Sequence, residues 1–109
     1  MLSDARTLAA KGNWNDIDAA VEVGASKAET VIYEQISQPE GKRRYVLRTS
    51  TFEPGELVVE RASAGPDPVE IRMRCSIGRF GDHAREERLM GYVRDRLAKL
   101  EGVGFAPIR

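Results

Sequence analysis

The stretch VEIRMRCSIGRFGDHAREERLMGYVRDRLAKL, residues 69–100, decides the fold, because it runs from a strand through a tight turn into a helix. In its first nine residues apolar and polar side chains alternate, which is typical of a half-buried strand. The set expected to face inward is Val69, Ile71, Met73, Cys75 and Ile77. The set expected to face solvent is Glu70, Arg72, Arg74 and Ser76.

The turn and the helix after it predict how the chain folds back. Residues 78–82, GRFGD, place two glycines around Arg79 and Phe80, and Asp82 can accept hydrogen bonds from free N–H groups at a helix start. Beyond it, apolar side chains recur at steps of three and four and form one stripe. That stripe is Leu89, Met90, Val93, Leu97 and Leu100. We therefore expect the helix to pack on the apolar face of a sheet.

The first forty residues have the pattern of helices. Residues 3–11 predict a short helix that is capped by Ser3 and ended by Gly12. A second helix is expected from Ile17 to Ile36, because its apolar stripe keeps its phase across Gly24. Glycine costs about 1 kcal/mol relative to alanine inside a helix. Gly24 therefore either breaks this helix or lets another backbone come close, and we favour an unbroken or kinked helix.

Residues 42–77 predict three strands. Between 43 and 52 the side chains alternate, with Tyr45 and Leu47 on one side and Arg44 and Arg48 on the other. The proline–glycine pair at 54–55 suits the centre of a type II turn. Residues 56–62 follow as a strand of ambiguous facing, and a short link with two prolines leads into the strand at 69. Short connections join antiparallel neighbours, so these strands should form a meander.

These elements predict one α+β domain over residues 1–109, with two layers and the order helix, helix, strand, strand, strand, helix (ααβββα). Its parts are a helical part (1–40), an antiparallel three-stranded meander (42–77), a C-terminal helix (82–101) and a tail (102–109). The helices should cover one face of the meander. Gly102 is expected to end the last helix, and the tail either packs Val103 and Phe105 or forms a fourth strand. Gly91 inside that helix could mark a close approach to the sheet or to another chain.

The composition is that of an ordinary globular chain, with 41% hydrophobic and 31% charged residues. No apolar run approaches the roughly 20 residues of a membrane span, and the first residues do not resemble a signal peptide. One cysteine cannot form an internal disulfide, so we expect a cytoplasmic protein. The net charge is zero, yet residues 1–40 hold three basic and seven acidic residues. We interpret this asymmetry as two layers of complementary charge rather than a basic binding half beside an acidic regulatory half.

No catalytic cluster stands out. His83, the single histidine, lies among acidic residues at the start of the last helix and could transfer protons in a cleft. We favour a solvated position for it, because no nucleophile is fixed beside it by spacing. Cys75 belongs to the inward set and is expected in the core. One histidine and one cysteine cannot build the usual zinc sites, so no metal, cofactor or enzymatic activity is expected.

A surface is the remaining candidate site. If the inward set of residues 69–77 faces the helices, Arg44, Arg48, Arg72 and Arg74 project from the open sheet face, where they could contact phosphates. Arg79, beside free N–H groups at the helix start, could help to hold an anion. Modules that bind RNA on a sheet stack the RNA bases on aromatic side chains. On this face Phe52 is the one aromatic side chain that could serve in this way. A solvated, ion-paired face is the alternative, and we favour it.

The most consistent function is a non-catalytic protein-interaction or homo-oligomeric assembly module, since a small sheet would expose a face and two edges. Phe80, displayed between two glycines, is the candidate interface anchor. The competing interpretation, which we favour for this side chain, is that it packs over its own helix. Nucleic-acid binding through the arginine-bearing face is the alternative function, and no membrane partner is expected.

Overall fold

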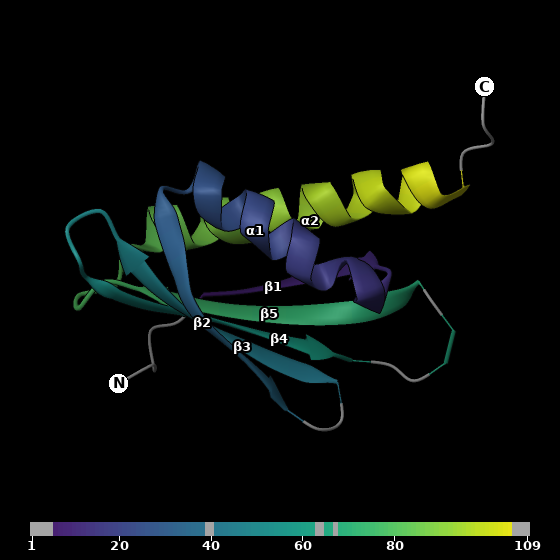
Figure 1. Ribbon diagram of the computed structural model, residues 1–109, viewed down its shortest axis with the longest axis horizontal. Coiled ribbons are helices and arrows are strands. Elements are labelled where there is room, and N and C mark those ends of the chain that lie inside the picture. The colour runs from purple at the N-terminus through teal and green to yellow at the C-terminus, as the bar shows by residue number, and fades with distance from the viewer. Residues whose placement is uncertain (1–5, 39–40, 63–64, 67, 106–109) are drawn as a thin grey trace.

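The computed structural model describes residues 6–38, 41–62, 65–66 and 68–105, the last five by their backbone alone. The five strands of the described part form one antiparallel sheet in the order β1-β5-β4-β3-β2. The strands are β1 (Arg6–Gly12), β2 (Thr30–Gln38), β3 (Lys42–Thr49), β4 (Pro54–Arg61) and β5 (Val69–Ile77). The helices are the 3₁₀ turn η1 (Trp14–Asp16), α1 (Ile17–Lys27) and α2 (His83–Phe105). Both α-helices lie on the same face of the sheet, which leaves the other face open (Figure 1).

The α+β class and the antiparallel β3-β4-β5 meander are confirmed, but the meander is the middle of a larger sheet and the predicted ααβββα order is wrong. Residues 3–11 were expected to be helical, and Arg6–Gly12 instead form the edge strand β1. Alanine favours a helix by intrinsic propensity. Pairing with β5 overrides that preference, because Leu8 lies opposite Met73 and Ala10 opposite Ile71 on the inner face.

The predicted helix from Ile17 to Ile36 is right across Gly24 but wrong beyond Lys27. Glu29 has a positive φ of 61°, which reverses the chain into β2. The Thr30 hydroxyl then donates to the Ala25 carbonyl at 3.0 Å and ties the new strand to the helix that precedes it. The expected helical part therefore contains two strands and one α-helix.

Two further boundaries differ from expectation. The proline–glycine pair at 54–55 begins β4 rather than forming a turn, and the reversal occurs at residues 49–53. There Phe52 has a φ of 64° and donates its N–H to the Thr49 carbonyl at 2.9 Å. Helix α2 continues through Gly102 to Phe105. The predicted helix end at Gly102 and the alternative of a fourth strand at 102–105 are therefore both wrong. Residues 106–109 of the expected tail, and the packing of Val103 and Phe105, lie outside the described part.

The inner face of β5 is the centre of the core, as predicted. All five side chains of its inward set are buried, and they pack with Leu89, Met90, Val93 and Leu97 of α2 in one cluster. Leu57 and Val59 of β4 share that cluster, which settles the facing of this strand. The two described helices lack an apolar stretch that could cross a membrane.

The two helix glycines have different surroundings. A Cβ atom at Gly24 would lie 2.6 Å from Val93 Cγ2 and 3.2 Å from the Leu89 carbonyl oxygen, so α1 and α2 cross where only glycine fits. The close approach expected at this position is therefore confirmed. At Gly91 the nearest described atom is a guanidinium nitrogen of Arg94 at 3.9 Å, and the close approach considered there is not found within the described chain.

Candidate functional site

The open face of the sheet carries the predicted arginines. Arg44 and Arg74 flank Val58, which lies opposite both of them in the register. Arg72 projects from the same face of β5 opposite Glu60, and Arg48 ends the row along β3. The alternation along β3 and β5 therefore places these four side chains as expected.

The structure groups these arginines into two hollows rather than one. Arg44, Arg48 and Arg79 line a hollow of about 590 Å³, which we call the arginine hollow. Its other lining residues are Val46, Pro54, Gly55, Glu56, Ser76 and Gly78. Arg72 and Arg74 line a second hollow of about 410 Å³ together with Lys42 and Glu60. Arg79 joins the first group because β4 and β5 bring the start of one strand beside the end of the other.

Two arginines of the arginine hollow have interaction partners within the protein. Arg44 forms an ion pair with Glu56 on the neighbouring strand. Arg48 donates to the Leu47 carbonyl at 3.0 Å and lies over the ring of Tyr33, 5.2 Å from its centroid. Arg48 has no carboxylate within ion-pair distance among the described residues, so its charge remains available.

The turn between β5 and α2 is held rigidly. The Gly78 N–H donates to the Pro54 carbonyl at 2.8 Å, and the Asp82 N–H donates to the Ile77 carbonyl at 2.8 Å. Gly78 and Gly81 have φ values of 78° and 79°, which glycine adopts without strain. Asp82 Oδ1 accepts from the Arg85 N–H at 3.2 Å, as expected of a helix cap. The loop that displays Phe80 is therefore fixed at both ends.

Glu86 is a buried carboxylate with a structural role that was not predicted from the sequence. One oxygen accepts the Ile77 N–H at 2.8 Å, and the other lies 2.8 Å from His83 Nδ1. A signal existed, because Glu86 continues the apolar stripe of α2 one turn before Met90. His83 is half-buried against this carboxylate rather than fully solvated. With both oxygens engaged, Glu86 positions the turn and offers no free base to a substrate.

The remaining candidate groups are the Cys75 thiol and side chains that could ligate a metal ion. Burial raises the pKa of the Cys75 thiol well above its ordinary value, and the carboxylates of Glu86 and Glu56 raise it further. The thiol thus stays protonated, which makes it a poor nucleophile. The described residues hold no group of three or more histidine, cysteine, aspartate or glutamate side chains that could ligate a metal ion.

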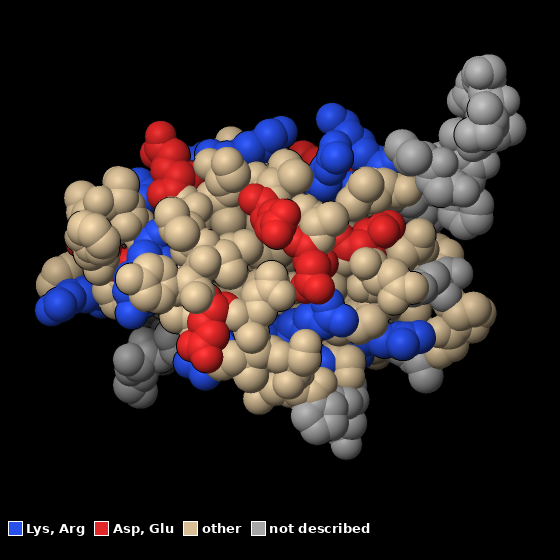
Figure 2. All heavy atoms as spheres, viewed as in Figure 1, with Lys and Arg blue, Asp and Glu red and all other residues tan. Residues whose placement is uncertain are grey.

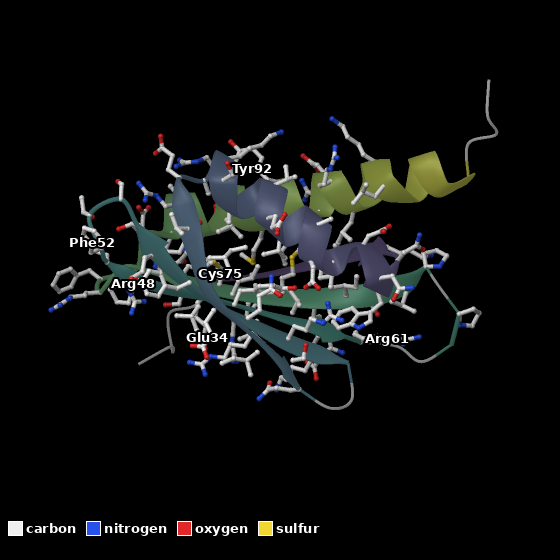
Figure 3. The ribbon with its side chains drawn as sticks, viewed as in Figure 1. Glu34, Arg48, Phe52, Arg61, Cys75 and Tyr92 are labelled. Carbon is white, nitrogen blue, oxygen red and sulfur yellow. The ribbon has the colours of Figure 1, made fainter. Side chains whose placement is uncertain are left out.

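Large apolar side chains are exposed at one end of the sheet. Phe80 is 96% exposed, Phe52 79% and Tyr33 67%, and we call these three residues the aromatic end. The Gly78–Pro54 hydrogen bond holds the Phe80 turn beside the start of β4, just after the turn that carries Phe52, and Figure 3 shows Phe52 and Arg48 at this end of the sheet. Our expectation that Phe80 packs over its own helix is wrong. Tyr33 was missed because its segment was predicted to be helical.

A groove runs along the outer edge of β2. Its volume is about 900 Å³, the largest of the hollows described here. One wall comes from the end of α1 and the turn after it, including Glu22, Ala25 and Glu29. The other wall is β2 from Thr30 to Gln35, with Ser50 at one end. The sequence pattern does not predict this groove, because the groove exists only if α1 ends before residue 30.

Comparison with known protein families and with curated protein sequences finds no match to this chain.

Proposed function

We propose that this protein is a non-catalytic interaction module that self-associates through the aromatic end. The observation that carries the proposal is the exposure of Phe80 and Phe52 on two turns that the Gly78–Pro54 hydrogen bond keeps at the same end of the sheet. Exposed aromatic side chains grouped in one place mark interaction sites on monomeric proteins. Because the Phe80 turn is already ordered, a partner gains this contact with little loss of chain entropy. The proposed setting is the cytoplasm, since the single cysteine is buried and unpaired.

The expected association is weak. An aromatic side chain buries about 150 to 250 Å². In a symmetric contact the two phenylalanines of both copies would together remove about 600 to 1,000 Å² from water. Stable interfaces bury about 1,200 to 2,000 Å² in total. We therefore expect a concentration-dependent equilibrium between monomer and dimer rather than a permanent assembly.

Sedimentation velocity over a wide range of protein concentrations tests this proposal. The wild-type protein should shift toward a dimer as concentration rises, and the Phe52→Ser/Phe80→Ser variant should stay monomeric. Ile36→Ser is the matched control, because it removes an apolar side chain from the other end of β2. A wild-type protein that remains monomeric at every concentration would sink the proposal, as would an equal loss of dimer in the control.

Nucleic-acid binding is the second candidate, and the convergence of Arg44, Arg48 and Arg79 in one hollow is the observation that favours it. The Glu56 partner of Arg44 argues against it, because a neutralised arginine releases no counterion from a phosphate. Fluorescence anisotropy with single-stranded and duplex ligands at low salt separates the two candidates. Binding that falls steeply with salt and disappears in Arg48→Ala/Arg79→Ala would support the second function, and an absence of binding at low salt removes it.

A further inference from the structure

Strand β2 ends the described sheet on one side, because it pairs with β3 and with no other described strand. Alternate residues of this nine-residue strand therefore present backbone N–H and C=O groups along an outer edge. Edge strands of this kind can accept an added strand from another chain. The groove between this edge and α1 gives such a strand a place to lie.

The groove is acidic. Glu22, Glu29 and Glu34 line it, and its lining includes no lysine or arginine. None of the three carboxylates has an ion-pair partner among the described residues, in contrast to Glu56 and Asp18. Figure 2 shows acidic side chains on this side of the molecule, over α1 and beside β2. A charged surface whose acids lack internal partners attracts a segment of opposite charge.

The same charges make a second copy of β2 a poor occupant. Symmetric pairing of two β2 edges would place Glu34 of each copy beside the acidic groove of the other. Like charges held close across an interface are destabilising. β2 itself contains no basic residue that could offset this repulsion.

We propose that the edge of β2 binds an extended basic segment of another protein by strand addition. Main-chain hydrogen bonds to β2 hold the segment. Its lysine or arginine side chains pair with Glu22, Glu29 and Glu34, and its apolar side chains lie on the partly exposed Ile32. The bulge at Tyr33, where the register with β3 shifts, shortens the regular edge and so discourages indiscriminate pairing. This inference rests on the proposed role as an interaction module, but it requires no self-association.

Three synthetic peptides test the proposal by fluorescence anisotropy at physiological salt. The first alternates valine and lysine over nine residues, the second alternates valine and glutamate, and the third is the lysine peptide with N-methylated alternate backbone amides. The lysine peptide should bind at least tenfold more tightly than either of the others. Equal binding of the N-methylated peptide would overturn strand addition, and equal binding of the glutamate peptide would overturn the charge argument.

Two variants of equal net charge locate the site. Glu29→Lys/Glu34→Lys changes the groove, whereas Glu60→Lys/Asp95→Lys changes exposed acids elsewhere. The groove variant should lose the lysine peptide and bind the glutamate peptide, while the control variant should keep the wild-type preference. An equal loss in both variants would mean that the attraction is merely global and would overturn the site.

Hydrogen exchange gives a structural readout, because strand addition should slow exchange of amides in β2 when the lysine peptide binds. Unchanged exchange in β2 would contradict the proposal. The same slowing without peptide, as the protein concentration rises, would show that a second copy occupies the edge and would also overturn it. The Phe52→Ser/Phe80→Ser variant should bind the peptide as the wild type does, so the outcome is readable even if self-association fails.

Discussion

Two cation–aromatic pairs occur on neighbouring parts of the molecule, and their surroundings differ. The Arg43 guanidinium lies 5.5 Å from the ring centroid of Trp14, and that of Arg48 lies 5.2 Å from the ring centroid of Tyr33. Arg43 also forms an ion pair with Asp18 at 2.7 Å, and the same carboxylate accepts the hydroxyl of Tyr45 at 2.6 Å. Arg48 has a backbone carbonyl and an exposed tyrosine instead.

The difference shows what the helix layer contributes. Near the start of α1, the contact between cation and ring is one part of a closed network that braces β3 against the helix. At the edge strand β2 the same kind of contact remains on the surface, where another molecule can complete it. We call these regions the closed side, formed by α1, α2 and the inner sheet face, and the open side, formed by β2 and the outer face. The first and last predictions change one residue on each side, and the second compares two glycines within the helix layer.

The largest difference is expected between two glutamates. Glu86→Ala on the closed side leaves the buried Ile77 N–H without an acceptor and opens a gap in the core. A loss of about 3 kcal/mol in the free energy of unfolding is expected, because an unsatisfied buried N–H and a cavity in the core are both destabilising. Glu34→Ala on the open side should change it by less than about 0.5 kcal/mol. Urea denaturation measures both values.

Glu86→Gln is the control for this pair of variants. Glutamine has the shape of glutamate and keeps one oxygen to accept the Ile77 N–H, so most of the lost stability should return. If Glu86→Gln were as unstable as Glu86→Ala, the contact with His83 would matter more than the bond to Ile77. If Glu86→Ala cost no more than Glu34→Ala, the distinction between the two sides would fail.

The second difference concerns the helix glycines. Gly24→Ala places a methyl group against Val93 and the backbone of α2, and overpacking of this kind costs about 1 to 3 kcal/mol. The higher helix propensity of alanine offsets up to about 1 kcal/mol of this cost. A net loss of about 2 kcal/mol is expected, because backbone atoms at the contact cannot move away. Gly91→Ala, whose methyl group would meet only the Arg94 guanidinium at 3.9 Å, should instead gain about 0.5 to 1 kcal/mol in thermal or urea unfolding. Equal effects of the two substitutions would contradict the close crossing of α1 and α2.

The closed side is also the part that the sequence predicted well. β5, β3 and most of α2 carry long, one-sided patterns, because each has one face on the core and one away from it. The edge strands lack such a pattern. β1 is rich in alanine, and its conformation is decided by its pairing with β5. In β2 the bulge puts one extra residue between Ile32 and Glu34, so the apolar positions no longer alternate and they mimic a helical stripe.

The candidate sites follow the same division. The positions of Arg44, Arg48, Arg72 and Arg74 on one face follow from strand alternation alone. Their separation into two hollows, and the arrival of Arg79 in the first, depend on how strands pair and could not be read from local spacing. The acidic groove depends on the end of α1 at Lys27, where the positive φ of Glu29 and the Thr30–Ala25 hydrogen bond reverse the chain without a glycine or proline.

The smallest difference is expected between two tyrosine hydroxyls. Tyr45→Phe removes the hydrogen bond to Asp18 and should lower the free energy of unfolding by about 1 kcal/mol. Tyr33→Phe should have little effect, because the Tyr33 hydroxyl has no hydrogen-bond partner among the described residues.

Burial raises the pKa of Tyr45 above its ordinary value of 10.0, and the Asp18 carboxylate raises it further. The Tyr45 phenol therefore ionises in the unfolded chain before it ionises in the folded protein, as the pH rises above 10. Tyr45 thus makes the free energy of unfolding fall with rising pH, by at most about 1.4 kcal/mol per pH unit. In urea denaturation from pH 8 to 11, Tyr45→Phe should show a shallower alkaline loss than the wild type. Parallel curves would mean that the phenol is not held neutral by the fold, and the network at the start of α1 would then be no more closed than the surface pair at Tyr33.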